Sequence, residues 1–199
     1  MKKVVSPRFI ILLSIILLTG MWRVLQNIDG IAVWNFSPIG AMALFGGVYF
    51  SNRSKAYLLP VAILFSSDVV LMQTLYSEFS EGLLYSGWYW TYAAFLLMVT
   101  VGTFIRKVNF KTILSGSLTI ALLHFLVVNF GVWLGGGLDM STGQPYTRDL
   151  NGLLHCYGLA IPFLKNMIAG NILYGAILFG GFEWLQYRFP ALNNTVSIS

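Results

Sequence analysis

Residues 112–134 read TILSGSLTIALLHFLVVNFGVWL and contain no Asp, Glu, Lys or Arg. A helix of roughly 17–25 mostly apolar residues is long enough to cross a lipid bilayer, so this stretch predicts a transmembrane helix. Five more apolar runs occur along the chain, at residues 9–25, 35–50, 56–73, 88–105 and 154–185. We therefore expect an all-α membrane protein whose six transmembrane helices form a single domain over residues 1–199.

The composition excludes an ordinary soluble domain. Hydrophobic residues make up 57% of the chain and charged residues only 10%, whereas soluble globular domains contain about 25% charged residues. Apolar side chains can face lipid, but a surface in water needs more charge than this chain has. The single cysteine, Cys156, excludes an intramolecular disulfide, and we expect it to be a buried structural thiol.

Basic residues are distributed unevenly between the two sides of the predicted helices. Lys and Arg are enriched in the cytoplasmic loops of membrane proteins. If the N-terminus is cytoplasmic, only Arg23 and Arg148 lie in outer loops, and the inner segments hold Lys2, Lys3, Arg8, Arg53, Lys55, Arg106, Lys107, Lys111 and Arg188. The pattern predicts that both termini are cytoplasmic and that the protein lies in the cytoplasmic (inner) membrane of a bacterium.

The first predicted helix has an alternative interpretation as a signal peptide. Lys2, Lys3 and Arg8 precede its apolar run, as basic residues precede the apolar core of such a peptide. Residues 18–21, Leu-Thr-Gly-Met, lack the small-residue A-x-A pattern of a cleavage site. We expect the helix to be retained, since cleavage would leave five helices with the N-terminus outside.

Two ionisable residues lie inside predicted helices. Asp68 and Lys165 are each predicted near the middle of the bilayer, where an ionisable group is costly and usually functional. We expect them to form an ion pair between the third and sixth helices. The sequence leaves three roles open for this pair: a clamp between helices, a ligand contact and a proton relay.

Further polar residues are predicted in the outer half of the membrane, on several helices. Together with the two ionisable residues they form a candidate substrate-binding set: Asn35, Asp68, His124, Asn129, His155, Lys165 and Asn166. The alternative is that these side chains only make hydrogen bonds between helices. We expect the loops at 74–87 and 135–153 to cover the pocket from outside.

The chain lacks the motifs of several enzyme classes. It has no P-loop, no H-E-x-x-H and no G-x-S-x-G, so we do not expect an enzyme. Acid–base catalysis by His124 or His155 has no supporting motif. Two histidines and one cysteine are too few for a metal site, and no cofactor is expected.

Several motifs resemble an uncharacterised family of small bacterial integral-membrane proteins. The most specific is Asn35-Phe-Ser-Pro-Ile-Gly-Ala-Met-Ala-Leu-Phe-Gly-Gly47. It is followed, in the order of that family, by Leu59-Pro60, Ser67-Asp68, Val128-Asn-Phe-Gly-Val-Trp133, Gly152-Leu-Leu-His-Cys-Tyr157, Ile161-Pro-Phe163 and Gly170-Asn171. The motifs extend from the second to the sixth predicted helix.

That family in turn resembles the S-components, which are the substrate-binding subunits of energy-coupling-factor vitamin transporters. The resemblance implies six helices and an outer binding site for a vitamin-like or metal-containing small molecule. It also implies a partner module of one membrane coupling protein and two ATPases. The first predicted helix lacks the A-x-x-x-A docking motif of S-components, which leaves coupling to a standard module open.

We therefore expect a substrate-binding membrane subunit for the uptake of a small molecule. The alternative is a non-catalytic structural subunit of a larger membrane complex, which would share the same helices but have no ligand cavity. Nucleic acid is not expected as a partner despite the net charge of +5, because the basic residues form short clusters between apolar runs.

Overall fold

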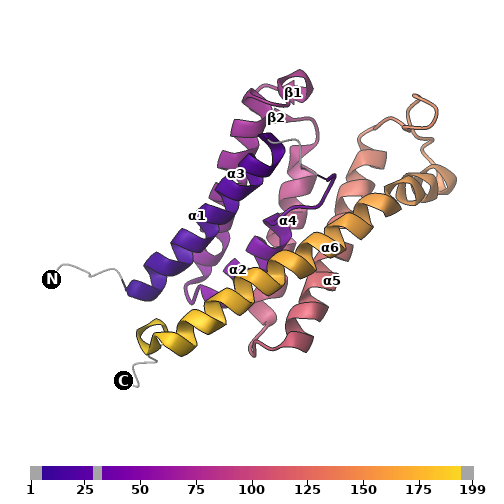
Figure 1. The fold of residues 1–199 in the computed structure, drawn as a ribbon. Helices are drawn as coiled ribbons and strands as arrows, with labels where there is room; N and C mark the ends of the chain where they lie inside the picture. The colour runs from indigo at the N-terminus through magenta and orange to yellow at the C-terminus, as the bar shows by residue number, and fades with distance from the viewer. Residues whose placement is uncertain (1–5, 29–32, 194–199) are drawn as a thin grey trace.

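The computed structural model describes residues 6–28 and 33–193, which form six α-helices and a few short elements (Figure 1). The helices are α1 (Pro7–Ile28), α2 (Ile39–Tyr49), α3 (Arg53–Gln73), α4 (Trp88–Phe104), α5 (Phe110–Leu134) and α6 (Leu150–Arg188). Between α3 and α4 lie a 3₁₀ turn, η1 (Ser77–Phe79), and a small antiparallel hairpin of β1 (Ser80–Glu81) and β2 (Leu84–Tyr85). A second 3₁₀ turn, η2 (Pro190–Leu192), follows α6. The prediction of an all-α chain with six helices is confirmed.

Four of these helices, α1, α3, α5 and α6, are long and apolar enough to cross a membrane, as is typical of an integral membrane protein. Helix α4 has 17 residues, at the lower end of the spanning range. Helix α2 has only 11 residues, and at 1.5 Å per residue it is about 16 Å long. The hydrocarbon core of a bilayer is about 30 Å thick, so α2 alone is too short to cross it.

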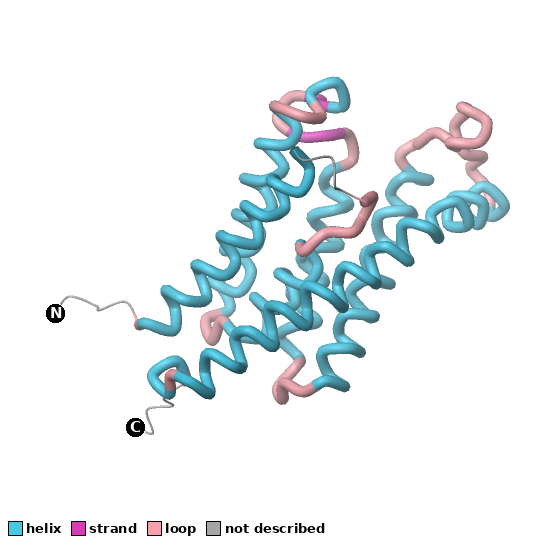
Figure 2. Tube along the Cα trace, in the orientation of Figure 1, coloured by secondary structure: helices cyan, strands magenta, loops and turns pink. Residues whose placement is uncertain are grey.

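The predicted helix at 35–50 is therefore wrong over its first four residues. The segment 33–38 is not helical and leads between the longer helices to the start of α2 (Figure 2). Ser37 precedes Pro38, and a residue in that position is sterically pushed out of the helical region. Asn35 has a φ of 61°, a left-handed conformation that asparagine tolerates better than most residues. Because of both features, the helix begins only at Ile39.

Helix α2 lies at the centre of the bundle and contacts each of the other five helices. Its residues from Gly40 to Gly47 are all buried, as expected for a helix that is apolar on every side. Glycines allow its neighbours to approach closely. A Cβ on Gly47 would overlap the backbone of α4 at Gly102, and a Cβ on Gly46 would lie 2.5 Å from Cγ of Pro60 on α3.

The beginning of α1 and the end of α6 meet at one end of the molecule (Figure 1). Arg8 joins them, because its Nη1 donates hydrogen bonds to Oε1 of Gln186 at 2.7 Å and to the carbonyl of Leu192 at 2.6 Å. The short hairpin and the 135–149 loop lie at the other end (Figure 1). The described chain thus starts and finishes on the same side of the bundle.

Candidate functional site

A cavity of about 700 Å³ is lined by residues from all six helices. Helix α1 contributes Arg23, Gln26 and Asn27, and α5 contributes four residues from His124 to Asn129. More than half of the lining side chains are apolar. Ligand pockets in proteins are typically of 300–1,000 Å³ and are mostly apolar with a few polar groups. The size and the lining of this cavity both match that description.

The non-helical segment 33–38 forms part of the cavity wall. Irregular backbone at membrane depth is tolerated only where protein or a cavity surrounds it, because its polar groups need partners. Side chains of the long helices provide some of them. Asn166 donates through Nδ2 to the carbonyl of Trp34 at 3.0 Å, and Gln26 donates through Nε2 to the carbonyl of Phe36 at 3.4 Å. These contacts hold the segment against α1 and α6.

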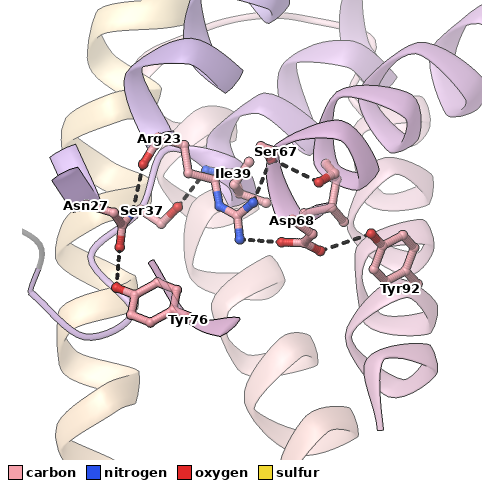
Figure 3. A network of polar contacts seen from close by, with 9 residues as sticks. Arg23, Asn27, Ser37, Ile39, Ser67, Asp68, Tyr76 and Tyr92 are labelled. Carbon is pink, nitrogen blue, oxygen red and sulfur yellow. Dashed lines mark hydrogen bonds and ion pairs between the residues drawn. The ribbon is translucent and has the colours of Figure 1, made fainter. Parts of the chain in front are cut away.

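The cavity contains a buried ion pair between α1 and α3 (Figure 3). Nη2 of Arg23 lies 2.5 Å from Oδ1 of Asp68, whose residue is only 1% exposed. Nη1 of Arg23 donates to Oγ of Ser67 at 2.6 Å, and the Tyr92 hydroxyl donates to Oδ2 of Asp68 at 2.9 Å. A buried charge needs an opposite charge and hydrogen bonds. Asp68 has both.

The predicted ion pair between Asp68 and Lys165 is therefore wrong. Lys165 is exposed on α6 and is not among the residues that line the cavity. The distribution of basic residues assigns Arg23 to an outer loop, although the predicted run 9–25 already includes it. In the structure Arg23 lies within α1, and its guanidinium pairs with Asp68 on α3.

The polar wall continues from Arg23 to the β1–β2 hairpin region. The Tyr76 hydroxyl donates to Oδ1 of Asn27 at 2.8 Å, and Nδ2 of Asn27 donates to the carbonyl of Arg23 at 2.6 Å (Figure 3). Tyr76, Phe79 and Tyr85 all line the cavity, so the connection between α3 and α4 covers it. None of the lining residues of this cavity comes from the 135–153 loop, which we had expected to be a second cover.

The structure brings four of the seven predicted site residues to the cavity: Asn35, Asp68, His124 and Asn129. The other three are His155, Lys165 and Asn166, and they do not line it. Asn166 acts indirectly, through its bond to the carbonyl of Trp34.

His155 belongs to a separate contact in the 135–149 loop. Its Nε2 lies 3.1 Å from Oδ2 of Asp139. Oδ1 of Asp139 accepts hydrogen bonds from the hydroxyl and the backbone N–H of Ser141, which lower the pKa of Asp139 to about 2. Cys156 is buried beside this loop, as predicted. In the described part of the chain, no three His, Cys, Asp or Glu residues are grouped as metal ligands would be.

The predicted set lacks seven polar residues of the cavity wall: Arg23, Gln26, Asn27, Ser37, Tyr76, Tyr85 and Thr91. A signal for the first three was available. They are spaced by three and four residues, which places them on one face of a helix. Arg23 was also one of only two basic residues on the predicted outer side, and that exception indicated a role other than orientation.

One comparison with known proteins found a match. The sequence profile of the Family of unknown function (DUF6580) matches residues 3–192. No curated protein and no solved structure shows significant similarity to the chain. The geometry of the cavity is therefore the main source of information on function.

Proposed function

The chain belongs to the family of unknown function DUF6580, and from its site we propose that it is a substrate-binding membrane subunit for the uptake of a small molecule. The observation that carries the proposal is the cavity of about 700 Å³ with the buried Arg23–Asp68 pair in its wall. Ionisable residues within transmembrane segments are rare, and they usually mark the path or the site of a substrate. A purely structural subunit needs neither the cavity nor the charges.

The proposed topology has six crossings with both termini in the cytoplasm. The second crossing combines α2 with segment 33–38, whose six residues can extend over about 20 Å. Together with the about 16 Å of α2, this is sufficient for a bilayer core. An even number of crossings agrees with the contact of Arg8 with Gln186 near the two ends of the chain. The basic residues of the predicted inner loops favour this orientation over its inverse.

The proposed mechanism starts with capture of the substrate from the outer side. The connection between α3 and α4, with Tyr76, Phe79 and Tyr85, would open to admit it and close over it. Release to the cytoplasm requires a further movement, for which the chain shows no nucleotide-binding motif. The resemblance to S-components suggests that a membrane coupling protein with ATPases supplies it.

The experiment uses the full chain, purified and reconstituted in lipid nanodiscs. Small molecules that copurify are extracted and identified by mass spectrometry, and their affinity is measured for Asp68→Asn, Asn129→Ala and the wild type. We expect each variant to bind at least about tenfold more weakly, a change of about 1.4 kcal/mol. The matched control is Lys165→Ala, which changes an exposed residue outside the cavity and should bind as the wild type does.

Two results would contradict the proposal. One is a preparation from bacterial membranes that carries no small molecule in stoichiometric amount and binds none from a cell extract. The other is equal affinity for the wild type, Asp68→Asn and Asn129→Ala, because both side chains line the cavity and the proposal assigns them to the binding site.

A further inference from the structure

The charges in the cavity wall balance each other. Among the described lining residues, Arg23 and Asp68 carry the only full charges at neutral pH, and they are paired with each other. A histidine with an ordinary pKa of about 6.5 is mostly neutral at that pH, and His124 is the only one in the wall. The remaining polar groups are amides and hydroxyls. Within the part of the chain that the structure describes, the wall therefore holds no spare charge to compensate that of a ligand.

A ligand with a net charge would leave that charge uncompensated in an enclosed, mostly apolar space. Removing an ion from water is costly unless an opposite charge and hydrogen bonds replace its hydration. An anion could take Arg23 only by displacing Asp68, which would then be the unpaired charge. A cation would meet the same problem at Asp68. The balanced pair thus disfavours both signs.

On the α1–α3 side of the cavity, the side-chain acceptors already have donors. Asp68 accepts from Arg23 and Tyr92, Asn27 accepts from Tyr76, and Gln26 accepts from Tyr174. The guanidinium of Arg23 has five N–H groups, and within the described chain two of these side-chain donors are engaged, by Ser67 and Asp68. Arg23 can therefore donate to a ligand without giving up its present partners.

The opposite wall has a different character. Helices α4, α5 and α6 contribute mostly apolar and aromatic side chains there, including Phe95, Met98, Phe125, Phe163 and Met167. They also contribute the polar side chains of Thr91, His124 and Asn129. Aromatic rings and thioethers pack well against flat apolar surfaces. A ligand that uses both walls needs an apolar or aromatic body and one polar edge.

The geometry assigns this cavity to an uncharged molecule with an apolar, ring-containing body and a carbonyl-type acceptor that faces Arg23. The assignment rests on the proposed function and narrows its substrate class. It excludes free carboxylates, phosphate esters, ammonium compounds and metal ions as the preferred ligand.

The test uses pairs of probes that differ only in charge. The pairs are 2-naphthamide with 2-naphthoate, and indole-3-acetamide with indole-3-acetate. The full-length protein in lipid nanodiscs is titrated with each compound, and the midpoint of thermal unfolding is followed. We expect each amide to reach its half-maximal effect at a concentration at least about tenfold lower than its matched carboxylate.

Variants of the ion pair test the cause of this preference. Asp68→Asn leaves Arg23 as an unbalanced positive charge, so the preference should reverse in favour of the carboxylate. The double variant Arg23→Gln/Asp68→Asn removes both charges and should again prefer the amide. If Asp68→Asn does not fold, the double variant still tests whether the charges determine the preference. Tyr92→Phe removes one hydrogen bond and no charge, and should keep the wild-type preference.

The outcomes separate the assignment from the proposed function. Tighter binding of the carboxylates by the wild type would overturn the assignment but leave a small-molecule cavity. Saturable binding of none of the four compounds would overturn the assignment, whereas the proposed function is decided by the copurified molecules. Asp29 lies outside the described residues, and a preference that changes in Asp29→Asn would also overturn the assignment, because Asp29 would then supply a charge to the site.

Discussion

Helix α1 carries an arginine near each end, and the two serve different purposes. Arg8 directs its donors to the protein itself, to Gln186, to the carbonyl of Leu192 and, at 3.4 Å, to the carbonyl of Tyr49. Its guanidinium also lies 5.2 Å from the ring centre of Phe182. Arg23 instead has an acidic partner, Asp68, and lines a cavity.

The difference shows how an arginine that joins helices can be distinguished from one that belongs to a site. The carbonyl and amide partners of Arg8 fix α1 against α2 and α6. Glu183 is nearby, but it accepts hydrogen bonds from Tyr49 and Gln186 and none from Arg8. At Arg23 a carboxylate balances the charge, and the pair adjoins empty space that a ligand can fill. Stability alone would not require that space.

The largest effect is expected from removing the acid of the pair. Asp68→Ala leaves Arg23 partly buried, at 18% side-chain exposure, without its counter-charge. Breaking a buried pair on one side costs about 3–5 kcal/mol; because Arg23 keeps some exposure, we expect about 3 kcal/mol. Thermal or denaturant unfolding in nanodiscs would measure it. Arg23→Gln/Asp68→Asn should recover most of the loss, and a double variant as unstable as Asp68→Ala would refute this account.

The next largest effect is expected from Arg8→Met, which should lower the free energy of unfolding and leave ligand binding unchanged. Hydrogen bonds to a charged group contribute about 1.5–3 kcal/mol, and Met keeps the apolar contact with Phe182, so we expect a loss of about 2 kcal/mol. Binding of 2-naphthamide should change less than about twofold once the protein is fully folded. If Arg8→Met weakened binding as much as Asp68→Asn does, the proposed division between the two arginines would be wrong.

Much of the fold could be predicted from the sequence, because the signal for a membrane helix is strong and local. The runs at 56–73, 88–105 and 112–134 agree with α3, α4 and α5 within a few residues. The run at 35–50 was read as a helix because it is apolar. Its composition is set by burial at the centre of the bundle, and only Pro38 and Asn35 indicated that its beginning is not helical.

The candidate site was harder to predict, because partners are chosen by three-dimensional arrangement. Asp68 was singled out correctly as a buried acid, but its partner was not. Lys165 was predicted at a similar depth, yet depth does not determine which face of a helix points inward. His155 and Asn166 are on the same helix and meet different partners, Asp139 and the carbonyl of Trp34.

A smaller effect is expected from removing a hydrogen bond that holds segment 33–38 in place. Asn166→Ala removes the bond to the carbonyl of Trp34, and a typical hydrogen bond contributes about 1 kcal/mol. The segment lines the cavity beside Arg23, so we also expect binding of 2-naphthamide to weaken about threefold. Lys165→Ala, one residue away and exposed, is the matched control and should change neither quantity. Equal effects of the two substitutions would show that the support is unimportant.

The smallest effect concerns the 135–149 loop, which lies away from both arginines. Hydrogen bonds from Ser141 lower the pKa of Asp139 to about 2 from its ordinary value near 3.8. A carboxyl whose pKa is lowered by folding stabilises the loop fully above its ordinary pKa, and this stabilisation is lost as the pH falls toward 2. Amide exchange at the backbone N–H of Ser141 should therefore be slow at pH 5 relative to its intrinsic rate and lose this protection between pH 4 and pH 2.

Asp139→Asn tests whether the loop and the cavity are independent. The variant has no carboxylate to titrate, and its amide oxygen is a weaker acceptor for the Ser141 N–H. Protection at Ser141 should therefore be lower than in the wild type at pH 5 and should not change with pH in this range. The contact of His155 with a carboxylate oxygen is lost as well. Because no residue of the 135–153 loop lines the cavity, binding of 2-naphthamide at neutral pH should be unchanged. A loss of binding in Asp139→Asn would show that the loop takes part in ligand capture, and that the function of this protein is not confined to the surroundings of Arg23.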